Sequence, residues 1–283
     1  MAGGTWFTED QREGLELSFK VKGTLVSKHT PYQKLDIYDT YKYGILLTLD
    51  DLVMTTEKDE FVYHELIAHV PLFSHQHPQE VLIIGGGDGG TAREIVKHPC
   101  ITRIDMVEID EQVVVMSKQY MPFLAKDLTN PKVHLYFQDG VEFVKNTIST
   151  YDVIIIDSTD PIGPGEGLLN TEFYRNCANI LKAGGILVSQ AESLFNNPDW
   201  VKQVFSKLRN VFPVVSAYAG TIPTYPAGLW CFAFCCNTPE PLNFFDEARF
   251  DRLQLALRYY NKGIHKACFA LPEFAKRLCQ GKG

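Results

Sequence analysis

A regular alternation of apolar and helical segments between residues 81 and 210 constrains the fold most strongly. The apolar segments lie at 81–84, 103–109, 133–137, 151–157 and 184–190. The segments with helical periodicity lie near 91–98, 110–120, 140–148, 170–182 and 198–210. Strands that read as continuous apolar runs, joined by helices, are typical of a parallel sheet covered on both faces. We therefore expect an α/β domain with five parallel strands.

Two more apolar segments extend this pattern. Residues 212–219 and 228–236 are joined by a turn rich in Gly and Pro, which predicts a hairpin beside the parallel strands. Five parallel strands and a late hairpin are the arrangement of a methyltransferase-like Rossmann domain, with a seven-stranded, mostly parallel sheet. The tail, 245–283, is apolar enough to be predicted as helical and packed on this domain.

The N-terminal region has a different pattern. Residues 15–55 show short alternating runs separated by turn signals, which predict a small antiparallel β-domain. A helix with its apolar residues on one face is predicted over 57–73. We expect an N-terminal antiparallel β-domain at 1–56 and a Rossmann-like catalytic domain at 57–283.

Composition narrows the classes of function. The 34 acidic and 27 basic residues give a net charge of −7, and no Lys/Arg cluster suggests a nucleic-acid surface. No run reaches the about 18 apolar residues of a membrane span, and the first residues do not resemble a secretory signal, so we expect a cytoplasmic protein. The seven cysteines contain no C-x-x-C pair, and "HQH" at 75–77 has no third ligand nearby. We predict no metal site.

Acidic residues follow every predicted parallel strand or lie close to its end. In an open α/β sheet, ligands bind beyond these carboxyl ends. The acids are Asp88, Glu108, Asp110, Asp139, Asp157, Asp160 and Glu192, with Gln190 among them. Helix capping is a common role for Asp and accounts for Asp110 and Asp139. It does not account for so many acids at one edge, where like charges repel unless cations share the site.

The glycine turn after the first strand, Gly85-Gly86-Gly87-Asp88-Gly89-Gly90, predicts the class of cofactor. A carboxylate such as Glu108 can accept both ribose hydroxyls, and an acid beside a small residue, Asp139 and Gly140, suits an adenine amino group. Asp88 would repel a pyrophosphate and would be a poor neighbour for a carboxylate. We therefore expect an adenosine-containing molecule with a cationic tail, as in decarboxylated S-adenosylmethionine.

Four separated motifs resemble one family. "MTTEKDEFVYHE", "VLIIGGGDGGTARE", "DSTDPIGPGE" and "IPTYPAGLW" occur in the order found in the polyamine aminopropyltransferases, the family of spermidine synthases. The resemblance covers nearly the whole chain. It implies transfer of an aminopropyl group from decarboxylated S-adenosylmethionine, a co-substrate, to the polyamine substrate putrescine. It also implies a homodimer or larger homo-oligomer and no tightly bound cofactor.

The resemblance also implies roles for single residues. Asp157 is the expected general base. The expected substrate-binding residues are His64, Asp88, Asp160, Tyr63, Tyr225, Gln190 and Glu192. The expected cofactor-binding residues are Gln33, Gly85, Gly87, Glu108, Asp139, Gly140 and Pro164. Met54 stands where some relatives have glutamine, and we assign it no contact.

Three other functions are compatible with parts of the pattern. A methyltransferase acting on putrescine nitrogen would place the carboxylate of ordinary S-adenosylmethionine near Asp88. A non-enzymatic polyamine sensor or partner subunit would not need a base such as Asp157. A dehydrogenase is disfavoured by Asp88, because its dinucleotide carries a pyrophosphate.

Overall fold

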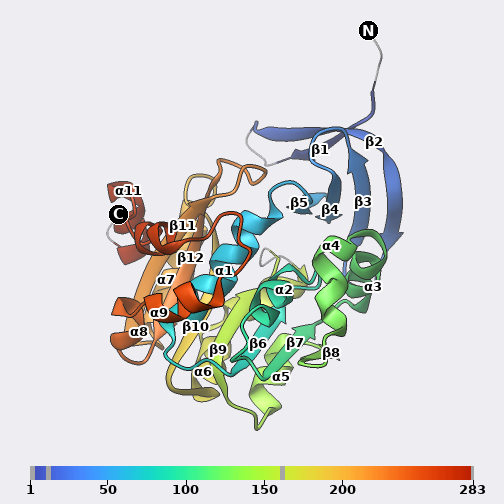
Figure 1. Cartoon of the computed structure of the whole chain (residues 1–283). Helices are drawn as coiled ribbons and strands as arrows, with labels where there is room; N and C mark the ends of the chain where they lie inside the picture. The colour runs from blue at the N-terminus through green and yellow to red at the C-terminus, as the bar shows by residue number, and fades with distance from the viewer. Residues whose placement is uncertain (1–3, 11–13, 160–162, 282–283) are drawn as a thin grey trace.

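The computed structural model describes residues 4–10, 14–159 and 163–281. Within these ranges the strands form a five-stranded sheet, ordered β1-β2-β3-β4-β5, and a seven-stranded sheet, ordered β11-β12-β10-β9-β6-β7-β8. Figure 1 shows the first sheet standing over one end of the second, with helix α1 crossing the centre of the molecule. The predicted fold class is confirmed.

The antiparallel sheet differs from prediction in two respects. Its strands are β1 Trp6–Asp10, β2 Glu16–His29, β3 Lys34–Thr40, β4 Ile45–Leu49 and β5 Leu52–Thr56. The sequence did not predict β1. The predicted runs 15–21 and 24–29 form the single strand β2, whose register against β3 shifts on either side of Gly23 and Thr24. A shift of this kind breaks the alternation of faces, so one strand reads as two.

The seven-stranded sheet follows the predicted pattern. Its strands are β6 Glu80–Gly85, β7 Arg103–Glu108, β8 Val133–Phe137, β9 Tyr151–Asp157, β10 Leu181–Ser193, β11 Val214–Thr221 and β12 Leu229–Cys236. The pairings β6–β7, β6–β9, β7–β8 and β9–β10 are parallel, and β12 is antiparallel to both β10 and β11. Strand β10 continues beyond the predicted end at Gln190 through an irregularity before Ser193.

Helices cover both faces of this sheet. They are α1 Glu60–Ser74, α2 Gly90–Val96, α3 Glu111–Tyr120, α4 Pro122–Ala125, η1 Lys126–Thr129, α5 Gly140–Asn146, η2 Gly163–Leu169, α6 Thr171–Asn179 and α7 Pro198–Arg209. The tail contributes α8 Glu240–Asn243, α9 Glu247–Leu253, α10 Lys262–Ala267 and α11 Glu273–Gln280. No helix within the described ranges combines the length and the apolar character needed to span a bilayer.

Helix α1 is more deeply buried than its sequence pattern predicts. Of its residues only Phe61 is not buried, so the helix buries its polar side as well as the predicted apolar face. The helix is enclosed by the sheet, by α2 and by the tail, which together cover its polar residues as well. Those polar residues must therefore find partners inside the protein.

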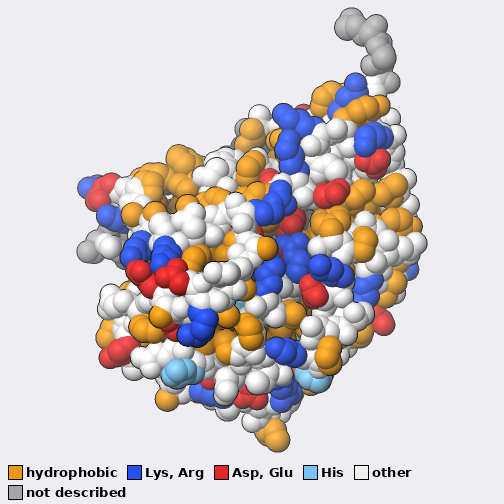
Figure 2. All heavy atoms as spheres, viewed as in Figure 1, with side chains coloured by type: hydrophobic (Ala, Val, Ile, Leu, Met, Phe, Trp, Pro, Cys, Tyr) orange, Lys and Arg blue, Asp and Glu red, His pale blue; other side chains and the backbone are white. Residues whose placement is uncertain are grey.

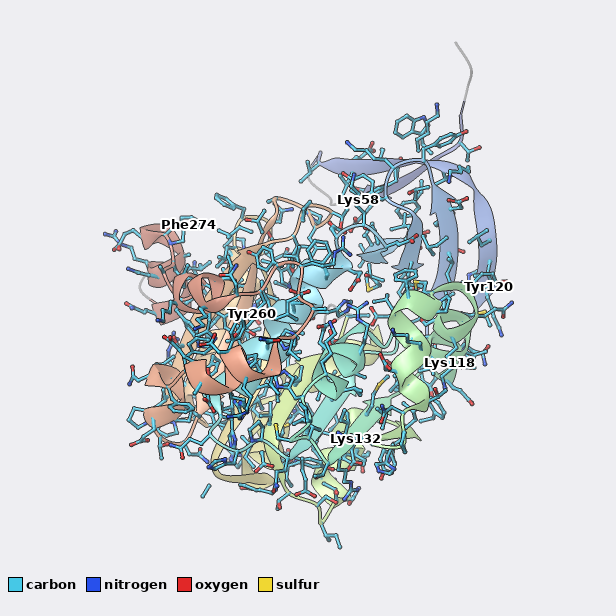
Figure 3. All side chains as sticks on the ribbon, in the orientation of Figure 1. Lys58, Lys118, Tyr120, Lys132, Tyr260 and Phe274 are labelled. Carbon is cyan, nitrogen blue, oxygen red and sulfur yellow. The ribbon has the colours of Figure 1, made fainter. Side chains whose placement is uncertain are left out.

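One apolar cluster joins the small sheet to the helices that follow β7. Leu35 and Leu47 of the antiparallel sheet pack with Val113 of α3 and Leu124 of α4. Tyr120, at the end of α3, packs against this cluster beside the five-stranded sheet (Figure 3). The cluster fixes the small sheet above the carboxyl ends of the parallel strands, where the sequence places the candidate site.

Candidate active site

A cleft lies between the small sheet and the carboxyl ends of β6, β7 and β9. It holds about 930 Å³ of space between protein atoms, including the part open to solvent. The predicted site residues that line it are Gln33, Tyr63, His64, Gly85, Gly87, Asp88, Glu108, Asp139, Gly140, Asp157 and Tyr225. The topology therefore brings most of the predicted residues to one place.

Asp157 ends β9 at the floor of the cleft. Tyr63 Oη donates to its Oδ1 at 2.7 Å, and Thr91 Oγ1 donates to its Oδ2 at 2.7 Å. Burial raises the pKa of Asp157, and the negative charge of Asp88 raises it further, while His64 and the two hydroxyl donors oppose the shift. A carboxylate with a raised pKa accepts a proton more readily, which suits a general base.

Asp88 in the glycine turn has the opposite shift. Its Oδ1 accepts from the backbone N–H of Gly90 at 2.7 Å, and its Oδ2 faces Nε2 of His64 at 3.4 Å. Burial alone would raise the pKa of Asp88, but His64 and the Gly90 N–H hold it below its ordinary value. Two neighbouring carboxyl groups whose pKa values are shifted in opposite directions are typical of catalytic sites.

Glu108 lies at the other side of the cleft, at the end of β7. Its Oε1 accepts from the backbone N–H of Asp110 at 2.9 Å. Its Oε2 approaches Gly87 so closely that a Cβ there would lie 2.8 Å from it, which explains why residue 87 lacks a side chain. Burial raises the pKa of Glu108 to about 7, against the effect of the backbone donors.

Asp139 and Asp110 both cap helices, as the capping interpretation allows. Asp139 accepts from Val141 N at 2.7 Å at the start of α5, and Asp110 accepts from Gln112 N at 3.0 Å at the start of α3. Gln33 reaches this side from the small sheet and donates to Asp110 Oδ2 at 3.0 Å. Asp139 is exposed and Gly140 is buried beside it. No sequence motif indicated the apolar residues that line this side, which are Leu47, Leu49, Val113 and Leu168.

Gln190 and Glu192 line a second cavity, not the cleft itself. This cavity shares Met54, Tyr63, Ser158, Thr159 and Tyr225 with the cleft, so the two adjoin. The Tyr63 and Tyr225 rings lie 6.0 Å apart between centroids, and Tyr225 Oη donates to the backbone oxygen of Met54 at 2.6 Å. The aromatic pair thus forms part of the wall where the cavities meet.

Glu192 is held in an unusual conformation at the far end of this second cavity. It is buried with a φ of 77°, a value uncommon for a residue with a side chain. Its Oε2 accepts from Ser193 N at 3.0 Å and from Asn197 Nδ2 at 2.8 Å. In the described part of the chain its Oε1 has no hydrogen-bond partner. A buried carboxylate oxygen of this kind suits a cationic ligand.

The side chains of two predicted residues lie outside the described part of the chain, and three residues around the site were not predicted. Asp160 lies outside the described residues, as does the side chain of Pro164, whose backbone belongs to η2. Thr91, which contacts Asp157, was not predicted because a threonine in a helix is usually unremarkable. Glu9 of β1, which lines the second cavity, was missed with its strand. Glu60, the partner of His64, was also missed, although the motif containing it was noted.

The sequence matches two family models over most of its length. Residues 60–247 match the spermine/spermidine synthase domain, and residues 5–57 match the spermidine synthase tetramerisation domain. The chain therefore belongs to the spermine/spermidine synthase family. Among curated proteins, the polyamine aminopropyltransferase of Alkaliphilus metalliredigens is 47% identical over 274 residues, or 96% of each chain. That of Moorella thermoacetica is 46% identical over 278 residues, covering 98% of this chain and 97% of the relative.

Two solved structures support the same family assignment. A spermidine synthase in complex with the transition state analogue AdoDATO has a TM-score of 0.95 and 37% identity, over 98% of this chain and 95% of the other. The spermidine synthase of Thermotoga maritima has a TM-score of 0.93 and 36% identity, over 98% and 94% of the two chains. The protein is a transferase of the aminopropyltransferase type, and its family assignment from the sequence motifs is confirmed.

Proposed function

We propose that the protein is a spermidine synthase, which transfers an aminopropyl group from decarboxylated S-adenosylmethionine to putrescine. The products are spermidine, 5′-methylthioadenosine and a proton. The observation that carries the proposal is the pair Asp157 and Asp88, whose pKa values are shifted in opposite directions in the cleft that adjoins the cavity of Glu192. This reaction requires a base, an anchor for ammonium groups and a second subsite that binds an ammonium group.

The base has a defined task. A primary ammonium with a pKa near that of Lys, about 10.4, must lose a proton before it can attack, at a cost of roughly 4.6 kcal/mol at pH 7. Asp157 accepts that proton. The free amine attacks the carbon beside the sulfonium, the C–S bond breaks, and its electron pair stays on sulfur as a neutral thioether. The leaving group therefore needs no acid, and alignment of the three reacting atoms contributes much of the remaining rate.

The donor's charge supports decarboxylated over ordinary S-adenosylmethionine. Both carry a sulfonium, but only the ordinary form carries a carboxylate on its amino-acid tail. Asp88 and Asp157 lie where that tail would extend from an adenosine held by Glu108, Asp139 and Gly140. Like charges at this place would repel, whereas a bare ammonium would be attracted. Gln33, Gly85, Gly87 and Pro164 are proposed as further contacts of the nucleoside.

The acceptor is proposed to lie between Asp157 and Glu192. One amine of putrescine would face Asp157, and Tyr63 and Tyr225 would flank its four carbons. Its other ammonium would donate to Oε1 of Glu192, with Gln190 beside it. Asp160 is proposed to contact the amines near the reacting end. We expect the enzyme to act in the cytoplasm as a homodimer or larger homo-oligomer, consistent with the tetramerisation domain matched by residues 5–57.

A mass-spectrometric assay tests the proposal. Purified protein is mixed with putrescine and, in separate reactions, decarboxylated or ordinary S-adenosylmethionine, beside an Asp157→Asn control. We expect spermidine and 5′-methylthioadenosine from the decarboxylated donor alone, and almost none from the variant. N-methylputrescine from the ordinary donor would instead establish a methyltransferase, and no product from either donor would reject the proposed substrates.

A further inference from the structure

A row of alternating charges runs from the cleft into the interior along α1 and α2. Asp88 faces Nε2 of His64 at 3.4 Å, and Nδ1 of His64 lies 2.7 Å from Oε2 of Glu60, one helical turn earlier in α1. Arg93 of α2 then donates to both oxygens of Glu60, at 3.0 and 2.8 Å. The order of charges is therefore carboxylate, imidazole, carboxylate, guanidinium.

The imidazole of His64 cannot move far within this row. Its ring lies on the backbone of the glycine turn, and a Cβ at Gly90 would meet three ring atoms at 2.3–2.4 Å. The ring of Tyr63 closes the other side in an edge-to-face contact with centroids 5.4 Å apart. With the ring fixed by packing, the partner on Nδ1 decides its protonation and hence what Nε2 offers to Asp88.

The His64–Glu60 pair also forms a partition between two cavities. His64 lines the cleft, whereas Glu60 and Arg93 line a separate cavity together with the cations Lys42, Lys58 and Arg258. Figure 2 shows Lys and Arg side chains gathered near the centre of the face it draws, in the region of α1 and α2. Glu60 itself is 5% exposed, so its charge acts mainly on His64 and Arg93.

We propose that Glu60 is a positioning residue for aminopropyl transfer, which acts through His64. By bridging Arg93 and His64, it keeps the imidazole in its cationic form with an N–H directed at Asp88. That N–H keeps Asp88 ionised and oriented for the ammonium groups of the substrates. The expected effect on the rate of aminopropyl transfer rests on the proposed function, whereas the expected effect on the charge of His64 concerns the ligand-free protein.

The groups around His64 support this role. Glu60 and Tyr63 face it from α1, Asp88 from the glycine turn, Asp157 from β9, and Arg93 lies behind Glu60 on α2. Burial would lower the pKa of His64, but Asp88 and Glu60 together raise it to about 10. Glu60, despite its burial, has a lowered pKa because His64 and Arg93 favour its anion.

The first test is an NMR titration of protein labelled in its histidine rings, with His64 assigned by a His64→Gln variant. We expect His64 to remain cationic at pH 8.5 in the ligand-free protein. In Glu60→Gln, which keeps the shape and removes the charge, its pKa should fall by at least one unit. Glu94→Gln is the matched control, because Glu94 accepts from Arg93 at 2.8 Å but pairs with His69 instead of His64, and there the pKa of His64 should stay unchanged.

The second test separates a charge effect from loss of structure. At pH 6 the imidazole is cationic with or without Glu60, so Glu60→Gln should react with putrescine at a rate near that of the parent. At pH 9.5 its kcat/KM should be about threefold lower, because a fall of one unit from a pKa of about 10 leaves roughly a quarter of the imidazole cationic, against roughly three quarters in the parent. A purely structural role would lower activity equally at both values.

The outcomes are distinct. A His64 that is neutral at pH 8.5 in the parent protein overturns the proposal without any variant, as does an unchanged pKa in Glu60→Gln. Normal spermidine formation by that variant at both pH values rejects the inference and leaves the proposed function intact. If the parent makes no spermidine while the pKa falls as expected, the proposed function fails and the electrostatic role of Glu60 remains.

Discussion

The two halves of the cleft use acidic residues in different ways. On the nucleoside side, Glu108 and Asp139 each accept a hydrogen bond from the backbone N–H group two residues further along the chain. On the amine side, Asp157 and Asp88 are contacted by side chains from α1 and α2, which are distant in sequence. The nucleoside side is thus built locally, whereas the amine side depends on how two helices pack.

This difference matters for chemistry. Backbone N–H groups are fixed dipoles that do not change charge between pH 5 and 9. Carboxyl groups that accept hydrogen bonds from them therefore keep a constant orientation toward the nucleoside. A side-chain partner such as His64 can titrate, and it holds the pKa of Asp88 down, while burial and the charge of Asp88 raise the pKa of Asp157. Proton transfer belongs on the side where protonation can be adjusted. Variants on the two sides should therefore separate turnover from nucleoside affinity.

Asp157→Asn should separate turnover from nucleoside affinity most strongly. Loss of the base should lower kcat by about 10³-fold, in the middle of the range for general acid–base catalysis. Affinity for 5′-methylthioadenosine should change little, because that ligand lies on the other side. Single-turnover kinetics and calorimetry measure the two quantities. A kcat within tenfold of the parent would show that Asp157 is not the base.

Glu192→Gln should affect the acceptor alone. A hydrogen bond between charged groups is worth about 1.5–3 kcal/mol, so we expect KM for putrescine to rise about 30-fold. Butan-1-amine provides the control, since it lacks the second ammonium and should react equally slowly with parent and variant. Steady-state kinetics with both amines measure these effects. An equal loss with both would place Glu192 at the reacting end instead.

Glu108 gives the nucleoside side its own pH dependence. Its pKa of about 7 lies above the ordinary 4.5, so ionisation of the ligand-free protein costs stability as pH rises through that interval. Ribose hydroxyls require the ionised form as acceptor. Affinity for 5′-methylthioadenosine should therefore increase about tenfold from pH 6 to pH 8, as a site with pKa 7 ionises. In Glu108→Gln the increase should vanish, and calorimetry at the two pH values measures it.

The same contrast explains what the sequence could predict. Continuous apolar runs predicted all seven strands of the large sheet, and the rule for strand ends then located Asp157, Glu108 and Asp139. Asp157 and Glu108 are the last residues of their strands, and Asp139 lies two residues after β8, so the local sequence determines their positions. The first strand of the small sheet was missed because Trp6–Asp10 is a short edge strand.

The missed residues depend on tertiary contacts. Thr91 meets Asp157 only when α2 packs beside the end of β9, and Glu60 meets Arg93 only when α1 packs on α2. No spacing in the sequence reports either contact. Glu192 was predicted beyond a strand end, yet it lies within β10, at an irregularity where its φ is positive. Glutamate has no preference for that conformation, so only the pairing of β10 with β12 reveals it.

The smallest expected effect concerns the two hydroxyl donors of Asp157. Burial and the charge of Asp157 raise the pKa of Tyr63 well above its ordinary value, so Tyr63 donates at every working pH. In Tyr63→Phe, the carboxylate loses one of its two donors, its anion is less stable, and its pKa should rise. The acidic limb of the pH–kcat/KM profile should move to higher pH, with kcat about threefold lower at pH 7, as expected for one hydrogen bond of about 0.5–1.5 kcal/mol. Thr91→Val removes the other donor and should move the limb in the same direction. A limb that stays in place in both variants would mean that the hydroxyls position Asp157 without tuning it, and the amine side would then resemble the nucleoside side.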